Sequence, residues 1–321
     1  QSYFRDAWES HGARQRYLLF HGVAEGDNHE HDDHLSFILQ AVDQMMCSDA
    51  GYSRGTYTGP ERTGWYVTAP AHNTLTFDGC AAHDVAPNQA PPSLFRVERP
   101  GLVGEEKEAF FGSEAEWRRT ILWIASDYYV VADRVNARRA GRIAAYLHGG
   151  RGQLSRHGAR RTWRYEDDRY GRAARLHTWL AAPQADVAEK TGEQTYIKGD
   201  YASFPYLEIS RSAKETAWLT LLQPAAPDER PHAVQDLSTA EYAALKIEAK
   251  GEQCLVVARP TPGKSVRVER VETDGALALV RWRADGTVQA YVVLDGTRLV
   301  VDGHPVWRVN TRADGAESAT R

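Results

Sequence analysis

The sequence predicts an all-β protein, an antiparallel β-sandwich followed by a smaller C-terminal β-domain. Short apolar runs rich in β-branched and aromatic residues recur along almost the whole chain, and turn residues separate them. Four Asp-Gly pairs, which favour tight hairpin turns, punctuate residues 274–303. Helical periodicity is convincing only over residues 239–245.

The strands are placed by their apolar runs and by the turn residues between them. Residues 71–77 alternate between polar and apolar side chains and stop at the turn pair Asp78-Gly79, whereas residues 51–66 are expected to form a glycine-rich loop. The expected strands are residues 2–8, 16–20, 35–46 (one strand or a pair), 71–77, 120–124, 128–132, 142–147 and 217–222.

The length of the chain is sufficient for a large core and for two domains. It has 321 residues, of which 42% are hydrophobic and 26% charged, as in ordinary globular proteins. Residues 223–231 contain three prolines among charged and amide side chains and are expected to be a linker. We therefore predict a sandwich over residues 1–225 and a smaller β-domain over residues 226–321, with a disordered tail from residue 311.

Charge and cysteine content exclude several classes of function. The net charge of −4 gives no global field for nucleic acid or an acidic membrane, so a polyanionic ligand would need a local arginine patch. Three cysteines exclude a disulfide scaffold and lack zinc-finger spacing, and free buried thiols are expected. No apolar run is long enough to span a membrane. Because Gln1 replaces a start methionine and no leader opens the chain, we expect an excerpt or a processed piece.

A cluster of titratable residues precedes the apolar run at residues 35–39. Residues 28–34 read Asn-His-Glu-His-Asp-Asp-His. In an extended segment His29, His31 and Asp33 would share one face, because alternate side chains point the same way. Neighbouring imidazoles indicate a metal site or an acid–base site. The alternative is a polar strand end with ordinary surface histidines.

Two further potential ligands lie at the ends of the next expected strands. Asp49 follows the apolar run that ends near residue 46, and His72 opens the alternating strand at residues 71–77. Together with His31 they would supply two imidazole nitrogens and one carboxylate, a set that suits Zn²⁺. The sequence therefore predicts a zinc site formed by His31, Asp49 and His72.

Three motifs in this order resemble the β-sandwich half of the heparinase II/III-like polysaccharide lyases. They are residues 28–37, 48–52 and 71–79, which are similar to that family's H-x-H-x-D strand, LVDPGTY-like turn and AHNT-x-x-x-DG strand. The resemblance covers roughly residues 3–79, and residues 129–135 and 146–148 extend it. It implies β-elimination of a uronic-acid polysaccharide, such as alginate or a glycosaminoglycan, by a bacterial periplasmic or secreted enzyme.

The resemblance also implies roles for individual residues. His29 would be the catalytic histidine that lines the cleft, and the zinc held by His31, Asp49 and His72 would be structural. Candidates for substrate binding are Arg54, Tyr57, Trp65 and Asn73. The family's N-terminal α/α toroid, which supplies a catalytic tyrosine, has no counterpart in these residues and is expected as a missing partner domain.

The chain departs from the family pattern at two places. The aspartate of the turn is followed by Ala50-Gly51-Tyr52 and not by Pro-Gly-Thr. Residues 66–68 read Tyr-Val-Thr where many members have an arginine, so Arg54 and Arg62 are the substitutes for a substrate-binding arginine.

Two other functions remain open at this point. His31, Asp33 and His72 could form the facial triad of an Fe(II) jelly-roll oxygenase. However, no lysine or arginine occurs between Asn73 and Phe95 to hold an oxoglutarate carboxylate.

The second alternative is a non-catalytic carbohydrate-binding sandwich, in which aromatic residues at positions 52, 57, 65 and 66 would stack on sugar rings. The expected partner is an acidic polysaccharide. Nucleic acid and membrane are not expected, and a homodimer is compatible with the sequence.

Overall fold

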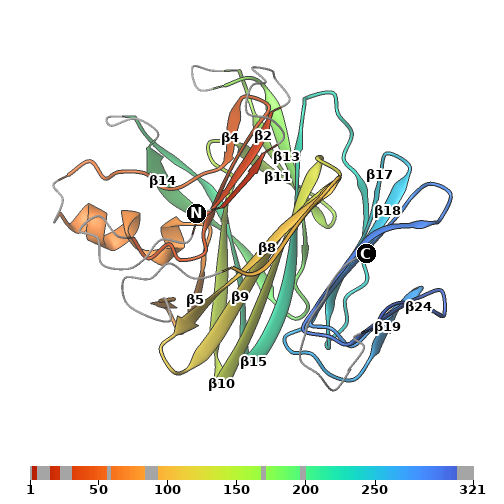
Figure 1. Ribbon diagram of the computed structural model, residues 1–321. Helices are drawn as coiled ribbons and strands as arrows, with labels where there is room; N and C mark the ends of the chain where they lie inside the picture. Colours follow the sequence, from red (N-terminus) through yellow and green to blue (C-terminus); the bar gives the residue numbers. More distant parts are fainter. Residues whose placement is uncertain are drawn as a thin grey trace.

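A computed structural model of the protein (Figure 1) describes residues 2–5, 15–21, 31–55, 59–83, 93–167, 171–195 and 200–308. Almost every regular element in these residues is a β-strand, and the strands pair antiparallel, which confirms the predicted all-β class. Among the helices described, none is long and apolar enough to cross a membrane.

The first sheet contains four consecutive strands, β1 (Ser2–Arg5), β2 (Arg16–Phe20), β3 (Phe37–Ala41) and β4 (Gln44–Cys47). The apolar run at residues 35–46 is therefore a strand pair. Val42 and Asp43, both at positive φ, form the turn between β3 and β4. Alternate side chains on β2 and β3, such as Leu18 and Leu39, are fully buried against the second sheet.

The second sheet is much larger and has eleven strands. Its order is β11-β12-β13-β15-β10-β9-β8-β7, with β14 beside β15, and with β5 joining β10 to β6. Its two longest strands, β10 and β15, pair along most of their length and are interrupted by a bulge between Asn136 and Gly141. The strands are β5 (Leu75–Phe77), β6 (Cys80–Ala81), β7 (Ser93–Arg99), β8 (Leu102–Phe111), β9 (Ala115–Ile124), β10 (Tyr128–His148), β11 (Gln153–His157), β12 (Arg160–Tyr165), β13 (Ala174–Ala181), β14 (Asp186–Thr195) and β15 (Tyr201–Ala225).

The C-terminal residues form two further sheets. The five-stranded sheet contains β16 (Ala233–Asp236), β17 (Ala243–Ala249), β18 (Glu252–Ala258), β21 (Leu277–Trp282) and β22 (Val288–Leu294). The four-stranded sheet contains β19 (Val266–Val268), β20 (Val271–Thr273), β23 (Arg298–Val301) and β24 (His304–Arg308). Asp302-Gly303, both at positive φ, make the hairpin turn that the sequence predicts between β23 and β24.

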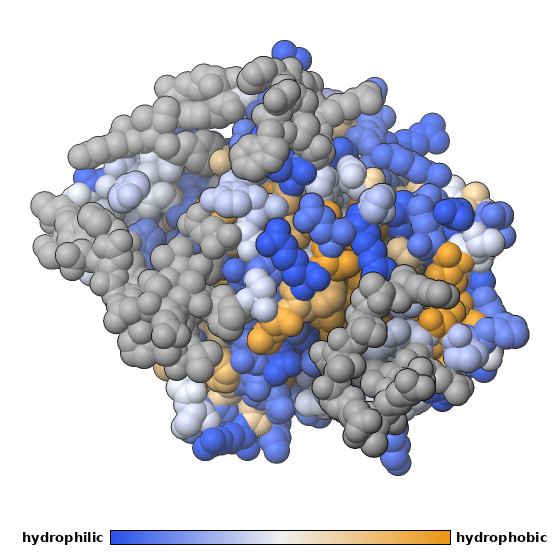
Figure 2. All heavy atoms as spheres, viewed as in Figure 1, coloured by the Kyte–Doolittle hydropathy of each residue, from blue (hydrophilic) through white to orange (hydrophobic). Residues whose placement is uncertain are grey.

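The large sheet is a middle layer with apolar side chains on both faces. On β10, Tyr129 and Val131 face the core shared with the first sheet, whereas Tyr128 and Val130 face the five-stranded C-terminal sheet. A strand buried on both faces reads as a continuous apolar run, as residues 128–132 do. The second core joins strands on both sides of residue 225, so the predicted domain boundary at 225/226 stays a prediction. Figure 2 shows that the viewed face is mostly hydrophilic, with apolar side chains gathered near its centre.

Four local predictions are wrong. The helix expected at residues 239–245 is absent from these described residues, and residues 243–245 begin β17. Ala243 and Leu245 face one core while Ala244 faces another, and such double burial imitates helical periodicity. β15 continues to Ala225, so residues 223–225 are strand and not linker. The strand expected at 71–77 is only β5, because the 3₁₀ helix η2 (Ala69–Ala71), which contains a proline, precedes it. The glycine-rich loop contains a π-helical turn, η1 (Arg62–Tyr66).

The cysteines are free, as expected, but only two of them are buried. Cys47 lies on β4 and Cys254 on β18, both inside apolar cores, whereas Cys80 on the short strand β6 is exposed.

Candidate metal centre

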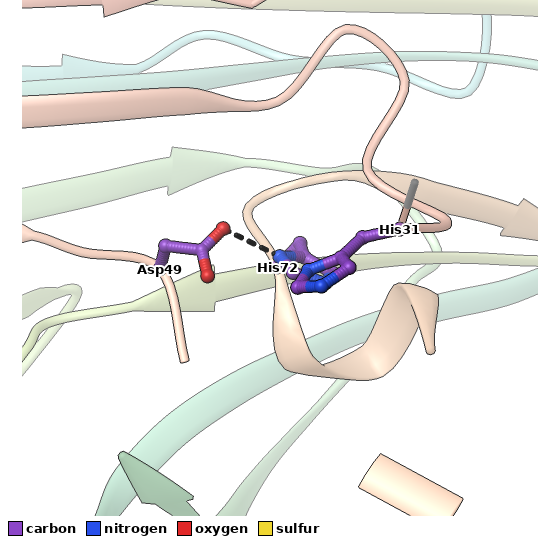
Figure 3. A group of neighbouring side chains, drawn as sticks. All are labelled: His31, Asp49 and His72. Carbon is purple, nitrogen blue, oxygen red and sulfur yellow. Dashed lines mark hydrogen bonds and ion pairs between the residues drawn. The ribbon is translucent and has the colours of Figure 1, made fainter. Parts of the chain in front are cut away.

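His31, Asp49 and His72 lie together in the structure (Figure 3), although they come from three separate segments. His31 precedes β3, Asp49 follows β4, and His72 lies between η2 and β5. One donor atom from each lies within 4.8 Å of the others. Nδ1 of His72 is 2.7 Å from Oδ2 of Asp49, and the two imidazole rings are 5.2 Å apart between their centroids. The geometry therefore offers two nitrogens and one carboxylate to a single ion.

The position of Asp49 depends on the residues after β4. The N–H of Gly51 donates to Oδ1 of Asp49 at 2.9 Å, and Gly51 has a φ of +79°, a conformation that glycine adopts without strain. A Cβ at this position would lie 2.2 Å from the carbonyl oxygen of Thr195. Thr195 in turn donates its N–H to Ala50 at 2.9 Å, and the side chain of Gln194 donates to the Asp49 carbonyl. The end of β14 thus fixes the Asp49 turn.

Asn73 holds the His72 segment against two neighbouring segments. Its Nδ2 donates to the carbonyls of Phe37 (3.0 Å) and Ser48 (3.3 Å), and its Oδ1 accepts from the N–H of His148 (2.8 Å). The side chain is 1% exposed. That Asn73 binds substrate stays a prediction, and the recorded hydrogen bonds of its buried amide all join it to backbone groups.

Arg119 is a second organising residue, which the sequence analysis did not identify. Its Nη1 donates to the carbonyls of Leu35 (2.8 Å) and Asn73 (2.6 Å), so it contacts the segments that follow His31 and His72. Its Nε and Nη2 donate to the two carboxylate oxygens of Asp133 at 2.7 and 3.0 Å. Both side chains are buried. A single arginine in a strand gives no sequence signal for this role.

The charges around the centre favour metal binding. Burial alone would raise the pKa of Asp49, but the charge and hydrogen bond of His72 and the Gly51 N–H lower it to about 2. Burial also acts to lower the pKa of His72, yet Asp49 outweighs it and the pKa is raised. Burial, and then the charge of His72, lowers the pKa of His31. The anionic carboxylate of Asp49 and the readily neutral imidazole of His31 are donors of the kinds that Zn²⁺ prefers.

A further observation fits an ion at this position. Nδ1 of His72 faces Asp49, whereas Nε2 is buried, and a backbone hydrogen bond with Tyr66 helps to raise the pKa of the ring. Metal-bound histidines commonly direct their second nitrogen toward a backbone carbonyl. The residues present therefore fit zinc.

Of three other candidate residues, only Arg54 lies in the described part of the chain. His29 and Tyr57 lie outside the described residues. Arg54 is exposed, donates to the carboxylate of Glu193 and lies over the ring of Tyr201 at 4.6 Å.

Glu193 also receives two aromatic donors. The half-buried Trp65 donates Nε1 to its carbonyl at 2.7 Å, and the buried Tyr66 donates its hydroxyl to its carboxylate at 2.6 Å. Glu193, on β14, was not identified from the sequence. Glu193 thus accepts hydrogen bonds from the side chains of Arg54, Trp65 and Tyr66 beside the metal centre.

His148, at the end of β10, is buried next to the segment that leads to His72. Its Nε2 lies 2.9 Å from the carbonyl of Pro70, and its ring stacks on Tyr206 with centroids 4.7 Å apart. Burial, opposed by the Pro70 carbonyl and supported by the charge of His72, lowers the pKa of His148 to about 4. A neutral imidazole packed in this way supports the site and is not positioned to exchange protons with solvent.

The segment 31–36 is a turn and not an extended strand end. The N–H of Ser36 donates to the carbonyl of Asp33, and Oδ2 of Asp33 lies 3.3 Å from Nδ1 of His21. Asp33 therefore does not join His31 and His72, and Asp49 occupies the carboxylate position. The facial triad of the oxygenase hypothesis is not assembled among these described residues.

Comparison with known proteins identifies a matching family and solved structures of similar fold. The model of the family described as "Heparinase II/III-like, C-terminal" matches residues 11–219. No curated protein matches the sequence. Solved structures similar in fold include a heparinase III gene product (TM-score 0.65, 13% identity, 80% of this chain and 40% of that chain). The heparan sulfate lyase HepC from Pedobacter heparinus is also similar (TM-score 0.64, 16% identity, 82% and 41%). This chain thus spans about 40% of the length of these structures.

Proposed function

Because the chain belongs to the heparinase II/III-like family, in its C-terminal portion, we propose that it is the β-sandwich part of a polysaccharide lyase. Its substrate would be a uronate-containing polysaccharide that is cleaved by β-elimination. The observation that carries this proposal is the convergence of His31, Asp49 and His72 from three separate segments in one partly buried centre. β-Elimination needs a neutralised uronate carboxylate, a base for the adjacent proton, and an acid for the leaving oxygen.

We assign the metal centre a structural role. The three ligands belong to segments that buried hydrogen bonds already hold together through Asn73 and Arg119. Zinc bound there would cross-link these segments and restrain the chain that precedes His31. The ligands themselves would hold the ion and leave proton transfer to other residues.

His29 is the proposed proton-transfer residue. It lies two residues before His31, so restraint of His31 restrains the backbone on which His29 is carried. Arg54 is the proposed partner of the uronate carboxylate, because its guanidinium is half exposed and its present carboxylate partner, Glu193, is itself partly exposed. An incoming uronate would exchange with Glu193. Trp65 and Tyr57 are proposed to support the sugar rings.

The isolated chain is proposed to be only one wall of the active site. The remaining wall, with the acid for the leaving oxygen, would come from an N-terminal helical toroid domain of the kind that the resemblance implies. Correct positioning of reacting groups contributes about 7–11 kcal/mol to such reactions, and an isolated wall would forfeit most of it. We further propose that the complete protein acts in the periplasm or outside a bacterial cell.

The experiment supplies the upstream helical domain in cis and follows unsaturated uronate by absorbance with alginate, heparan sulfate and hyaluronan. We expect turnover on one of these by the longer protein and little or none by residues 1–321 alone. His29→Ala should abolish turnover while zinc content and fold are kept, and His31→Ala is the matched variant that should lose zinc.

Robust turnover by the isolated chain would contradict the one-wall proposal. Zinc loss in His29→Ala would mean that the roles of the two histidines are exchanged. If the longer protein binds but cleaves none of the three polymers, the lyase proposal fails in favour of a carbohydrate-binding sandwich.

A further inference from the structure

Positive charge is concentrated in one short part of the chain. Residues 151–175 contain eight arginines, although the whole protein has a net charge of −4. Most of this segment forms β11, β12 and β13, at the edge of the large sheet. β13 also packs against the five-stranded C-terminal sheet through Trp179 and Ala181, whereas β11 is the edge strand. None of these arginines contacts the metal centre through any recorded interaction of the described residues.

The register of the strands places basic residues opposite one another. Arg164 on β12 pairs with Arg175 on β13, and Arg160 on β12 pairs with His157 on β11. Because side chains alternate along a strand, Arg160 and Arg164 share a face, and Trp163 occupies the opposite face, in the core. Like charges directly across two strands destabilise a sheet. The outer face thus carries a repulsion that brings no folding benefit.

Carboxylates do little to relieve this repulsion. Of the outer-face arginines, Arg164 alone has a recorded carboxylate partner among the described residues, Glu166 at 2.7 Å, and both members of that pair are about 60% exposed (58% and 60%). Arg175 donates to the backbone carbonyl of Pro227. Nε of Arg160 is buried without a hydrogen-bond partner. An exposed pair of this kind contributes little net attraction.

A buried histidine between the charges is also incompletely bonded. His177 on β13 is 3% exposed, and its Nδ1 lies 3.0 Å from the hydroxyl of Thr162. Its Nε2 has no partner among the described residues. Burial, and then the charges of Arg160 and Arg175, lowers its pKa to about 4, so the ring is neutral at physiological pH. The buried ring therefore lies between the arginine side chains and adds no charge of its own.

We propose that the exposed part of this face of β11–β13, formed by His157, Arg160, Arg164 and Arg175, binds acidic polysaccharide at a position separate from the cleavage site. Arg160 and Arg164 lie four residues apart on β12, or about 13 Å along the strand, and this spacing suits a polymer that carries repeated negative charges. Guanidinium groups bind carboxylate and sulfate in planar, two-point geometry. The inference rests on the proposed function only for the class of ligand.

The test uses the 321-residue chain and immobilised heparan sulfate fragments at several salt concentrations. The double variant Arg160→Gln/Arg164→Gln removes two charges from the face. The matched control, Arg267→Gln/Arg283→Gln, removes two exposed charges from the C-terminal sheets. We expect the first variant to bind about 5- to 10-fold more weakly at low salt, with a smaller dependence of affinity on salt, and the control to change affinity by less than about twofold.

Equal affinity of the two double variants, or no binding by the unmodified chain at low salt, would overturn the inference. Equally tight binding of a DNA duplex of similar charge would replace polysaccharide by nucleic acid and also overturn it. The result is independent of the lyase test. If the chain binds through this face but the longer protein cleaves no polymer, only the proposed reaction is refuted. If the longer protein cleaves a polymer but Arg160→Gln/Arg164→Gln binds as tightly as the unmodified chain, only the proposed binding surface is refuted.

Discussion

Replacement of Arg119 by methionine should damage both the fold and the metal centre. Arg119 donates two hydrogen bonds to Asp133 and one each to the carbonyls of Leu35 and Asn73. Methionine keeps much of the apolar volume but removes all four bonds. The carboxylate of Asp133 would remain buried, with the Nε1–H of Trp117 at 2.9 Å as its remaining recorded donor.

The size of the effect follows from burial. Breaking a buried ion pair by removal of one partner costs about 3–5 kcal/mol, and each orphaned buried carbonyl adds roughly 1–3 kcal/mol, although such values are not additive. We expect Arg119→Met to lower the free energy of unfolding by at least about 4 kcal/mol. Arg119→Lys should cost about half as much, because one ammonium group cannot reach the carboxylate and both carbonyls in planar geometry.

The assay combines denaturant unfolding with zinc competition by a chelator. The matched control is Arg142→Met, an exposed arginine on β10 that pairs with Glu208 at 2.6 Å and should change stability by less than about 1 kcal/mol. Because Arg119 fixes the segments that follow His31 and His72, Arg119→Lys should also weaken zinc binding about 10- to 100-fold. A stability loss below about 1 kcal/mol for Arg119→Met would refute this reasoning. A zinc affinity of Arg119→Lys equal to that of Arg142→Met would also refute it.

Three further predictions concern the metal centre and its supporting turn. His72→Ala should remove stoichiometric zinc and lower the melting temperature, and an unchanged melting curve would contradict the assignment. In metal-free protein, Asp49, whose pKa is lowered to about 2, should contribute stability above its usual pKa near 3.8 and lose it as the pH falls toward 2. His72, whose pKa is raised, should contribute stability below its usual value of 6.5 and lose it as the pH rises through the raised pKa. Stability of the metal-free protein, followed by thermal unfolding, should therefore be greatest between about pH 4 and 6.5, and a profile identical to that of His72→Ala would count against the pair. Gly51→Ala should cost at least about 3 kcal/mol, because its Cβ would meet a backbone carbonyl at 2.2 Å, whereas Gly286→Ala, at a similar φ of +82° with nothing within 4 Å, should cost about 1–2 kcal/mol.

The fold class and most strands are readable from the sequence because strand pairs with one buried face follow simple alternation. The hairpin at β23 and β24 is an example, since Asp302-Gly303 marks its turn directly. Where a segment is buried on both faces, the same rule fails. Residues 243–245 lie between two cores, so their apolar run resembles a helix until the strand partners are known.

The metal centre shows the same division between local and distant information. His31, Asp49 and His72 are detectable because each follows or precedes an apolar run, and their residue types suit one ion. What holds them is not local in sequence. Arg119 lies 46 residues after Asn73, and Gln194 lies 145 residues after Asp49, so their bonds become visible only when the sheets are assembled.

Asn73 illustrates why a motif position alone does not reveal the role of a residue. Its amide stands beside a metal ligand, where a substrate contact is a natural expectation, yet three backbone groups from separate segments occupy it. A buried amide that joins three strands is as tightly constrained as one that binds a sugar, so motif position cannot separate the two roles. The distinction lies in exposure, which depends on the whole fold. Polar residues beneath the centre therefore set its geometry, and the ligands named by the motif are the visible part of a larger hydrogen-bonded framework.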